Sequence, residues 1–132
     1  MREKFMKSAV FEVFFALLST PLQANDDEVL AAYRAFTEAE KSGDAKNALA
    51  FAEKAYLLAT EKWGPEKKQT GVLASNYAVQ LAHAGRENDA IEINDRCAEL
   101  LADHPDELAT RLDCLYEAGN ILSQTNVHDA FA

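Results

Sequence analysis

The 132-residue sequence predicts an all-α protein, a short α-solenoid of antiparallel helical hairpins with about two and a half repeats. Alanine and leucine dominate, and the β-branched residues form no alternating runs of the kind that strands need. Residues 43–49 (GDAKNAL) align with residues 85–91 (GRENDAI), a shift of 42 positions. Each stretch indicates a turn at glycine and then a helix with regularly placed small residues, which let a neighbouring helix approach closely.

The chain predicts five helices, at about 26–42, 45–62, 67–84, 87–103 and 105–118. Acidic residues at 26–28 favour the positive end of the first helix. Gly64-Pro65 ends the second, since proline cannot continue a helix and glycine accepts the left-handed cap. His104-Pro105 separates the fourth from the fifth, which we expect to close at Gly119. The tail, 120–132, fits a capping helix, a disordered end or the start of another repeat.

The first two dozen residues have the three-part layout of a secretory signal peptide. Residues 1–7 are basic, residues 8–22 are mostly apolar, and Ala24 precedes a polar stretch. We therefore expect cleavage after Ala24, a periplasmic or secreted protein, a helical-repeat domain over 25–119 and the tail over 120–132. The alternatives are a retained membrane anchor, which would be the chain's only membrane contact, or a cytoplasmic protein whose N-terminal helix covers the first repeat.

The repeated pattern of glycine, polar turn, Ala-Leu or Ala-Ile, and a small residue seven positions later resembles the tetratricopeptide repeat (TPR). Residues 42–58 match the second half of that repeat, and residues 84–100 match it again. The link between them, 61–66 (EKWGPE) followed by 73–78 (LASNYA), resembles the 42-residue repeats of the kinesin-light-chain type. The resemblance covers roughly 27–119, and it implies a module that binds other proteins.

In that family, the first helix of each repeat lines a concave groove that holds an extended peptide or a helix. Carried over by position, the resemblance implies a groove lined by Tyr33, Arg34, Thr37, Asn76, Val79, His83 and Asp113. Asn76 stands where the family often has an asparagine that bonds a peptide backbone, and its amide offers both a donor and an acceptor. The family's clamp for a C-terminal carboxylate is largely missing, because Tyr33 and Thr37 replace its Lys and Asn. A chaperone-tail ligand is therefore not expected.

Charge and motifs argue against several other classes of function. The net charge of −9 argues against a nucleic-acid groove, which needs clustered Lys and Arg. His83, His104 and His128 do not pair on one helical face, so we expect no metal. No nucleophile elbow, Ser-His-Asp pattern or phosphate-cradling loop is present, so we expect neither an enzyme nor a cofactor.

Cys97 and Cys114 are the only cysteines. Cys97 takes a small-residue position on the fourth predicted helix, facing the fifth, which carries Cys114. In an oxidising compartment the two could form a disulfide. Alternatively, both remain free and act as small, buried apolar residues.

These patterns leave three functions open. The first is an exported adaptor that binds an unidentified protein or peptide partner in its groove. The second is a structural or assembly protein that self-associates through open repeat ends, because terminal repeats expose a face. The third is a small enzyme whose catalytic residues carry no motif.

Overall fold

The computed structural model describes the backbone of residues 24–131 and the side chains of residues 26–126. These residues form five α-helices and one short 3-10 helix, without a strand among them. In chain order they are α2 (Ala24–Lys41), α3 (Ala45–Lys62), α4 (Lys68–His83), α5 (Glu87–Leu100), η1 (Pro105–Glu107) and α6 (Leu108–Phe131). The all-α class is confirmed. Of the expected signal peptide, residues 1–24, all but Ala24 lie outside the described residues.

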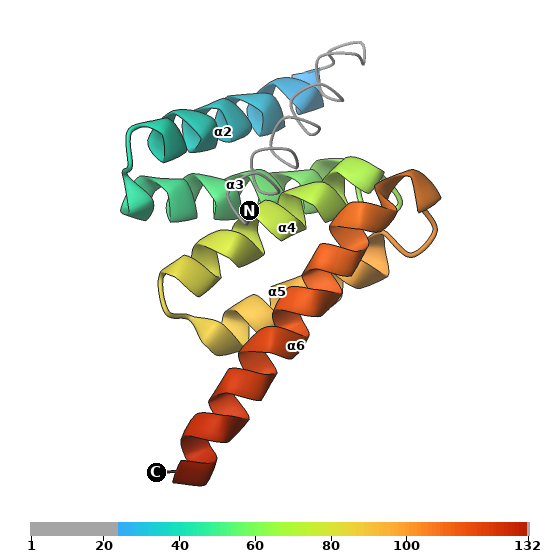
Figure 1. Cartoon of the computed structure of the whole chain (residues 1–132). Helices are drawn as coiled ribbons and strands as arrows, with labels where there is room; N and C mark the ends of the chain where they lie inside the picture. Colours follow the sequence, from blue (N-terminus) through green and yellow to red (C-terminus); the bar gives the residue numbers. More distant parts are fainter. Residues whose placement is uncertain (1–23, 132) are drawn as a thin grey trace.

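The helices pack in the order of the chain, each against the next, and α4 also touches α6. Figure 1 shows the α2–α3 hairpin at one end of the body and α6 at the other. The turns of the first two hairpins are alike, since Gly43 has φ 72° and Gly85 has φ 76°. This left-handed conformation costs glycine little, so the 42-residue repeat in the sequence corresponds to two equivalent turns.

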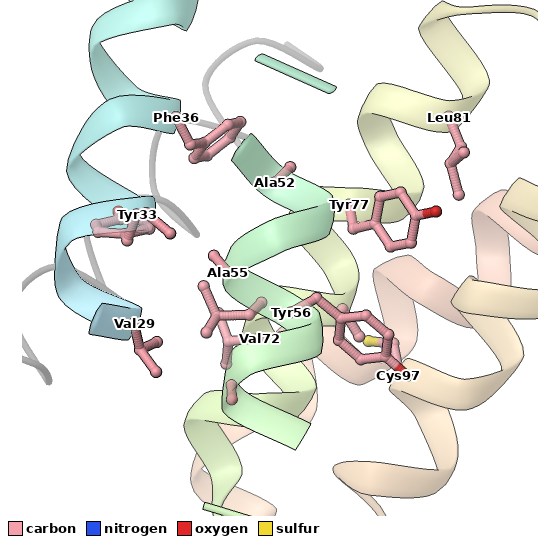
Figure 2. Close-up of a cluster of buried hydrophobic side chains, with 14 of the residues drawn as sticks. Val29, Tyr33, Phe36, Ala52, Ala55, Tyr56, Val72, Tyr77, Leu81 and Cys97 are labelled. Atoms are coloured by element: carbon pink, nitrogen blue, oxygen red, sulfur yellow. The ribbon is translucent and has the colours of Figure 1, made fainter. Parts of the chain in front are cut away.

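Alanines on α3 let this helix pack between two neighbours. Ala48, Ala52, Ala55 and Ala59 recur at helical spacing, and all are almost fully buried. Figure 2 shows Phe36 of α2 pointing toward Ala52, with Tyr56 and Tyr77 close together on the other side of α3. Larger side chains from α2 and α4 therefore fill the space that the alanines leave.

Ala90, the counterpart of Ala48 on α5, is fully buried. Ala90→Leu should lower the free energy of unfolding by about 1–3 kcal/mol, because a tightly packed contact has no room for three more carbons. Urea denaturation measures the loss. Ala50→Leu is the matched control, since Ala50 is exposed on α3 and surface changes usually stay within about 0.5 kcal/mol. An equal effect of both variants would contradict the packing described for Ala90.

The end of the last helix differs from the prediction. Gly119 does not close it, and α6 continues to Phe131. Among the described residues, the glycines with positive φ are Gly43, Gly64 and Gly85, so Gly119 keeps a helical backbone. Beyond it, Ile121 is buried, and the Thr125 hydroxyl donates a hydrogen bond to Glu87 Oε2 on α5 at 3.3 Å. These contacts along α5 favour continuation of the helix. Residues 120–131 are therefore part of the same helix as residues 108–118.

A disulfide joins Cys97 on α5 to Cys114 on α6, with 6.3 Å between their Cα atoms. Of the two alternatives that the sequence left open, the structure contains the bridged form. Both cysteines are buried. Their bond therefore fixes α6 to the body of the protein from within the α5–α6 contact.

Candidate functional site

The candidate groove residues of α2 and α4 follow helical spacing. Asn76, Val79 and His83 stand at i, i+3 and i+7 on α4, and Arg34 and Thr37 stand at i and i+3 on α2. Residues at these intervals lie on one side of a helix. Each helix therefore presents its candidate residues together.

The C-terminal ends of α2 and α4 are held side by side by a hydrogen bond. Gln80 Nε2 donates to Glu40 Oε1 at 3.1 Å. Burial raises the pKa of Glu40 above its ordinary value, while the hydrogen bond from Gln80 and the nearby His83 partly oppose this rise. This polar cluster places His83 of α4 close to the end of α2.

Asn76 is the most unusual residue of this face. Its side chain is 5% exposed, and its amide nitrogen Nδ2 is buried without a hydrogen-bond partner. Among the described residues no other buried side-chain nitrogen or oxygen is left unpaired. An unpaired buried donor costs about 1–3 kcal/mol, and native proteins contain few of them. The folded chain therefore supplies no acceptor for this amide nitrogen.

The other candidate residues occupy different environments. Arg34, His83 and Asp113 are exposed, and Thr37 and Val79 are half-buried. The Thr37 hydroxyl donates to the Arg34 carbonyl within α2, at 2.9 Å. Asp113 lies on α6, where partial desolvation of its carboxyl group raises its pKa and the neighbouring Glu117 raises it further. Asp113 and Glu117 thus form an acidic pair on α6, whereas the candidate residue Arg34 on α2 is a cation.

Tyr33 does not line an exposed face. Its side chain is 0% exposed, and its ring lies 6.1 Å from that of Phe36 in the core. The repeat pattern predicted Tyr33 in the groove, but α2 buries apolar residues on more than one side, including Val29 and Ala32. Tyr33 therefore belongs to the packing of α2 and not to a surface open to a partner.

Sequence reasoning missed the polar contacts between helices. The Tyr77 hydroxyl donates to Glu53 Oε2 on α3 at 2.9 Å. Burial, followed by this bond to a carboxylate, raises the pKa of Tyr77 to about 12. Trp63 Nε1 donates to Asp26 Oδ1 at 2.6 Å and ties the end of α3 to the start of α2. Such pairs are 24 to 37 residues apart, so no local spacing in the sequence reveals them.

Metal sites and membrane spans are two further features that helical proteins often carry. Within the described residues, no three His, Cys, Asp or Glu side chains are grouped so that they could hold a metal ion. No helix in the same part of the chain is long and apolar enough to cross a membrane.

Comparisons of the chain with protein-family models, with curated proteins and with solved structures find no match. Its function is therefore inferred from the residues and contacts described above.

Proposed function

We propose that this chain is a TPR-like protein-interaction module, a short α-solenoid that binds an extended peptide or a helix of a partner protein across α2, α4 and α6. The observation that carries the proposal is the buried, unpaired amide nitrogen of Asn76. A backbone carbonyl of a bound peptide would accept its hydrogen bond once the Asn76 side chain, which is 5% exposed in the free chain, turns toward the surface. Because every residue carries such a carbonyl, this contact suits a peptide of any sequence.

The charges of the candidate residues on α2 and α6 suggest the kind of peptide. Arg34 and Lys41 are exposed cations on α2, where Lys41 lies 3.6 Å from Glu38, whereas Asp113 and Glu117 lie on α6. A segment with acidic residues toward α2 and basic residues toward α6 would meet opposite charges at both ends. Complementary charges of this kind contribute to specificity and association rate more than to affinity. We therefore propose a dipolar segment in preference to a purely apolar helix.

The packing of each helix on the next and the two equivalent glycine turns support the repeat architecture. The absence of chemical motifs from the sequence supports a binding role without a cofactor. A separate observation, the exposed apolar residues of α6, favours the assembly role.

A double substitution tests the binding face. Asn76→Ala with Arg34→Ala should abolish co-purification of the protein that the tagged chain retains from its source. The fold should survive, because Arg34 is exposed and the packing lost at the buried Asn76 is partly offset by removal of its unpaired donor. Circular dichroism and thermal melting verify the fold.

The matched control carries the same two residue types on α5. Asn88→Ala with Arg96→Ala removes an exposed asparagine and an exposed arginine away from the proposed face. Retention of the partner by the control and its loss by the test variant is the expected result. If both variants retained the partner equally, the proposed binding face would be wrong.

We further propose that the protein is exported and loses its first 24 residues. The disulfide supports this, because structural disulfides form and persist mainly in oxidising compartments. Mass spectrometry of the periplasmic or secreted fraction should find a chain that begins at Asn25. Intact protein beginning at Met1 and confined to the cytoplasm would contradict export.

A further inference from the structure

Helix α6 exposes an apolar stripe that no described helix covers. Leu57 of α3 is the one large hydrophobic residue of comparable exposure elsewhere in the described chain. The other exposed large hydrophobic residues form the stripe on α6: Leu108, Leu112, Leu115, Tyr116 and Leu122. Contiguous apolar surface on a single element is a feature of interaction sites, whereas scattered exposed leucines are not.

The stripe has the spacing of a helix–helix seam. Positions 108, 112, 115, 119 and 122 alternate steps of four and three, the pattern that keeps one side of a helix facing a partner helix. Gly119 is the only member of this line without a side chain. Cys114, Ala118 and Ile121 are buried on a different side of α6. The stripe is therefore separate from the surface that packs onto α5.

We propose that a second copy of the chain covers this stripe, with the two α6 helices antiparallel about a two-fold axis at Leu115. In this register Leu112 of each copy faces Gly119 of the other, and Leu108 faces Leu122. No atom lies within 4 Å of the point where a Cβ of Gly119 would stand, so the position has room for a leucine. A two-fold interface must be complementary to itself. The stripe meets this condition, because the leucine at 112 in one copy faces the glycine at 119 in the other.

The charges along α6 favour the antiparallel direction. Asp106, which pairs with Lys68, and Glu107 precede the helix, and the register places them opposite the uncharged Ser123 and Gln124. The same register sets Asp113 level with Glu117 of the other copy, but helical spacing places both on the side of α6 away from the stripe. A parallel pair would bring the acidic residues of both copies together at one end. Like charges in close proximity oppose association. The helix dipoles also attract each other in an antiparallel pair, whereas they repel each other in a parallel pair.

The size of the stripe predicts a weak, reversible dimer. Four half-exposed leucines and one tyrosine offer roughly 450 Å² per copy, against about 800 Å² per partner in standard stable interfaces. Association should therefore appear at micromolar and higher concentrations. Because each copy carries a net charge of −9, added salt should strengthen the dimer by screening their repulsion.

Sedimentation of the purified chain from about 1 µM to about 1 mM tests the dimer. We expect a concentration-dependent sedimentation coefficient, which Leu112→Lys shifts to at least about tenfold higher concentration. Leu57→Lys is the matched control, because Leu57 and Leu112 are both 53% exposed. A chain that stays monomeric over the whole range, or an equal effect of both variants, would overturn the proposal. The proposal would also be overturned if the chain stayed monomeric and a different protein covered the stripe.

A charge pair tests the register. Gly119→Glu fits the isolated chain, since the position is open. In the antiparallel dimer, Leu112→Lys combined with Gly119→Glu places opposite charges face to face twice, so the double variant should dimerise more tightly than Leu112→Lys alone. A double variant no better than the single one would overturn the antiparallel pairing. None of these substitutions touches Asn76 or Arg34, so failure here leaves the proposed binding face to its own test.

Discussion

Loss of the Cys97–Cys114 disulfide should lower the free energy of unfolding by about 3 kcal/mol. The two cysteines are 17 residues apart, and a loop of this length restricts the unfolded chain by roughly that amount. For a small domain, whose total stability is typically about 5–15 kcal/mol, this is a large share. The C-terminal half of α6 should be affected most, because the described contacts beyond the bridge are few.

Urea denaturation with and without reductant measures this loss. The oxidised protein should unfold at a clearly higher urea concentration than the reduced protein. The variant with Cys97→Ala and Cys114→Ala should resemble the reduced form and should not respond to reductant. Both cysteines are buried, so the substitutions add a smaller loss from lost packing. A wild-type midpoint that reductant leaves unchanged would show that the bridge does not stabilise the native protein.

Local signals in the sequence predicted the helix ends well where a cap determines them. The predicted bounds of α3, 45–62, agree with the structure. Asp44 accepts a hydrogen bond from the Asn47 backbone N–H at the start of this helix, and Gly64-Pro65 follows its end. The end of α6 could not be predicted in this way. There, the burial of Ile121 and the hydrogen bond from Thr125 to Glu87 on α5 override the tendency of Gly119 to end a helix.

The candidate site could be predicted less well from the sequence than the helix ends. Spacing placed Asn76, Val79 and His83 on one side of α4, but it could not distinguish a side open to partners from a side packed in the core. Tyr33 shows this limit, because its position in the repeat pattern suggested a groove and its side chain is fully buried. The unpaired amide of Asn76 depends on every neighbour in three dimensions. No pattern along the chain contains that information.

The close contact between α4 and the end of α5 should make Gly71 nearly irreplaceable. A Cβ added at Gly71 would lie 2.6 Å from Leu101 Cδ2, 2.7 Å from Leu101 Cγ and 3.2 Å from Leu100 Cβ. Leu101 is fully buried, so its side chain has little space into which to move. Gly71→Leu should therefore lower the free energy of unfolding by about 3 kcal/mol, at the upper end of the usual cost of overpacking.

Gly119 provides the matched control, because it is also a helical glycine but has nothing within 4 Å of the point where its Cβ would stand. Replacing glycine by leucine inside an exposed helix should stabilise it by up to about 1 kcal/mol. The same substitution is thus expected to have opposite signs at the two positions. Urea denaturation at low protein concentration, where self-association is negligible, measures both. Destabilisation of similar size at both glycines would contradict the α4–α5 contact as the cause of the loss at Gly71.

A double-mutant cycle then assigns the strain to its source. Leu101→Ala alone should cost about 2–5 kcal/mol by leaving a cavity. Combined with Gly71→Leu, it should cost less than the sum of the two single losses, because the new side chain occupies the space that Leu101 vacates. Coupling between residues in contact is typically about 0.5–3 kcal/mol. Additive losses would place Gly71 and Leu101 out of contact and would contradict the α4–α5 packing described here.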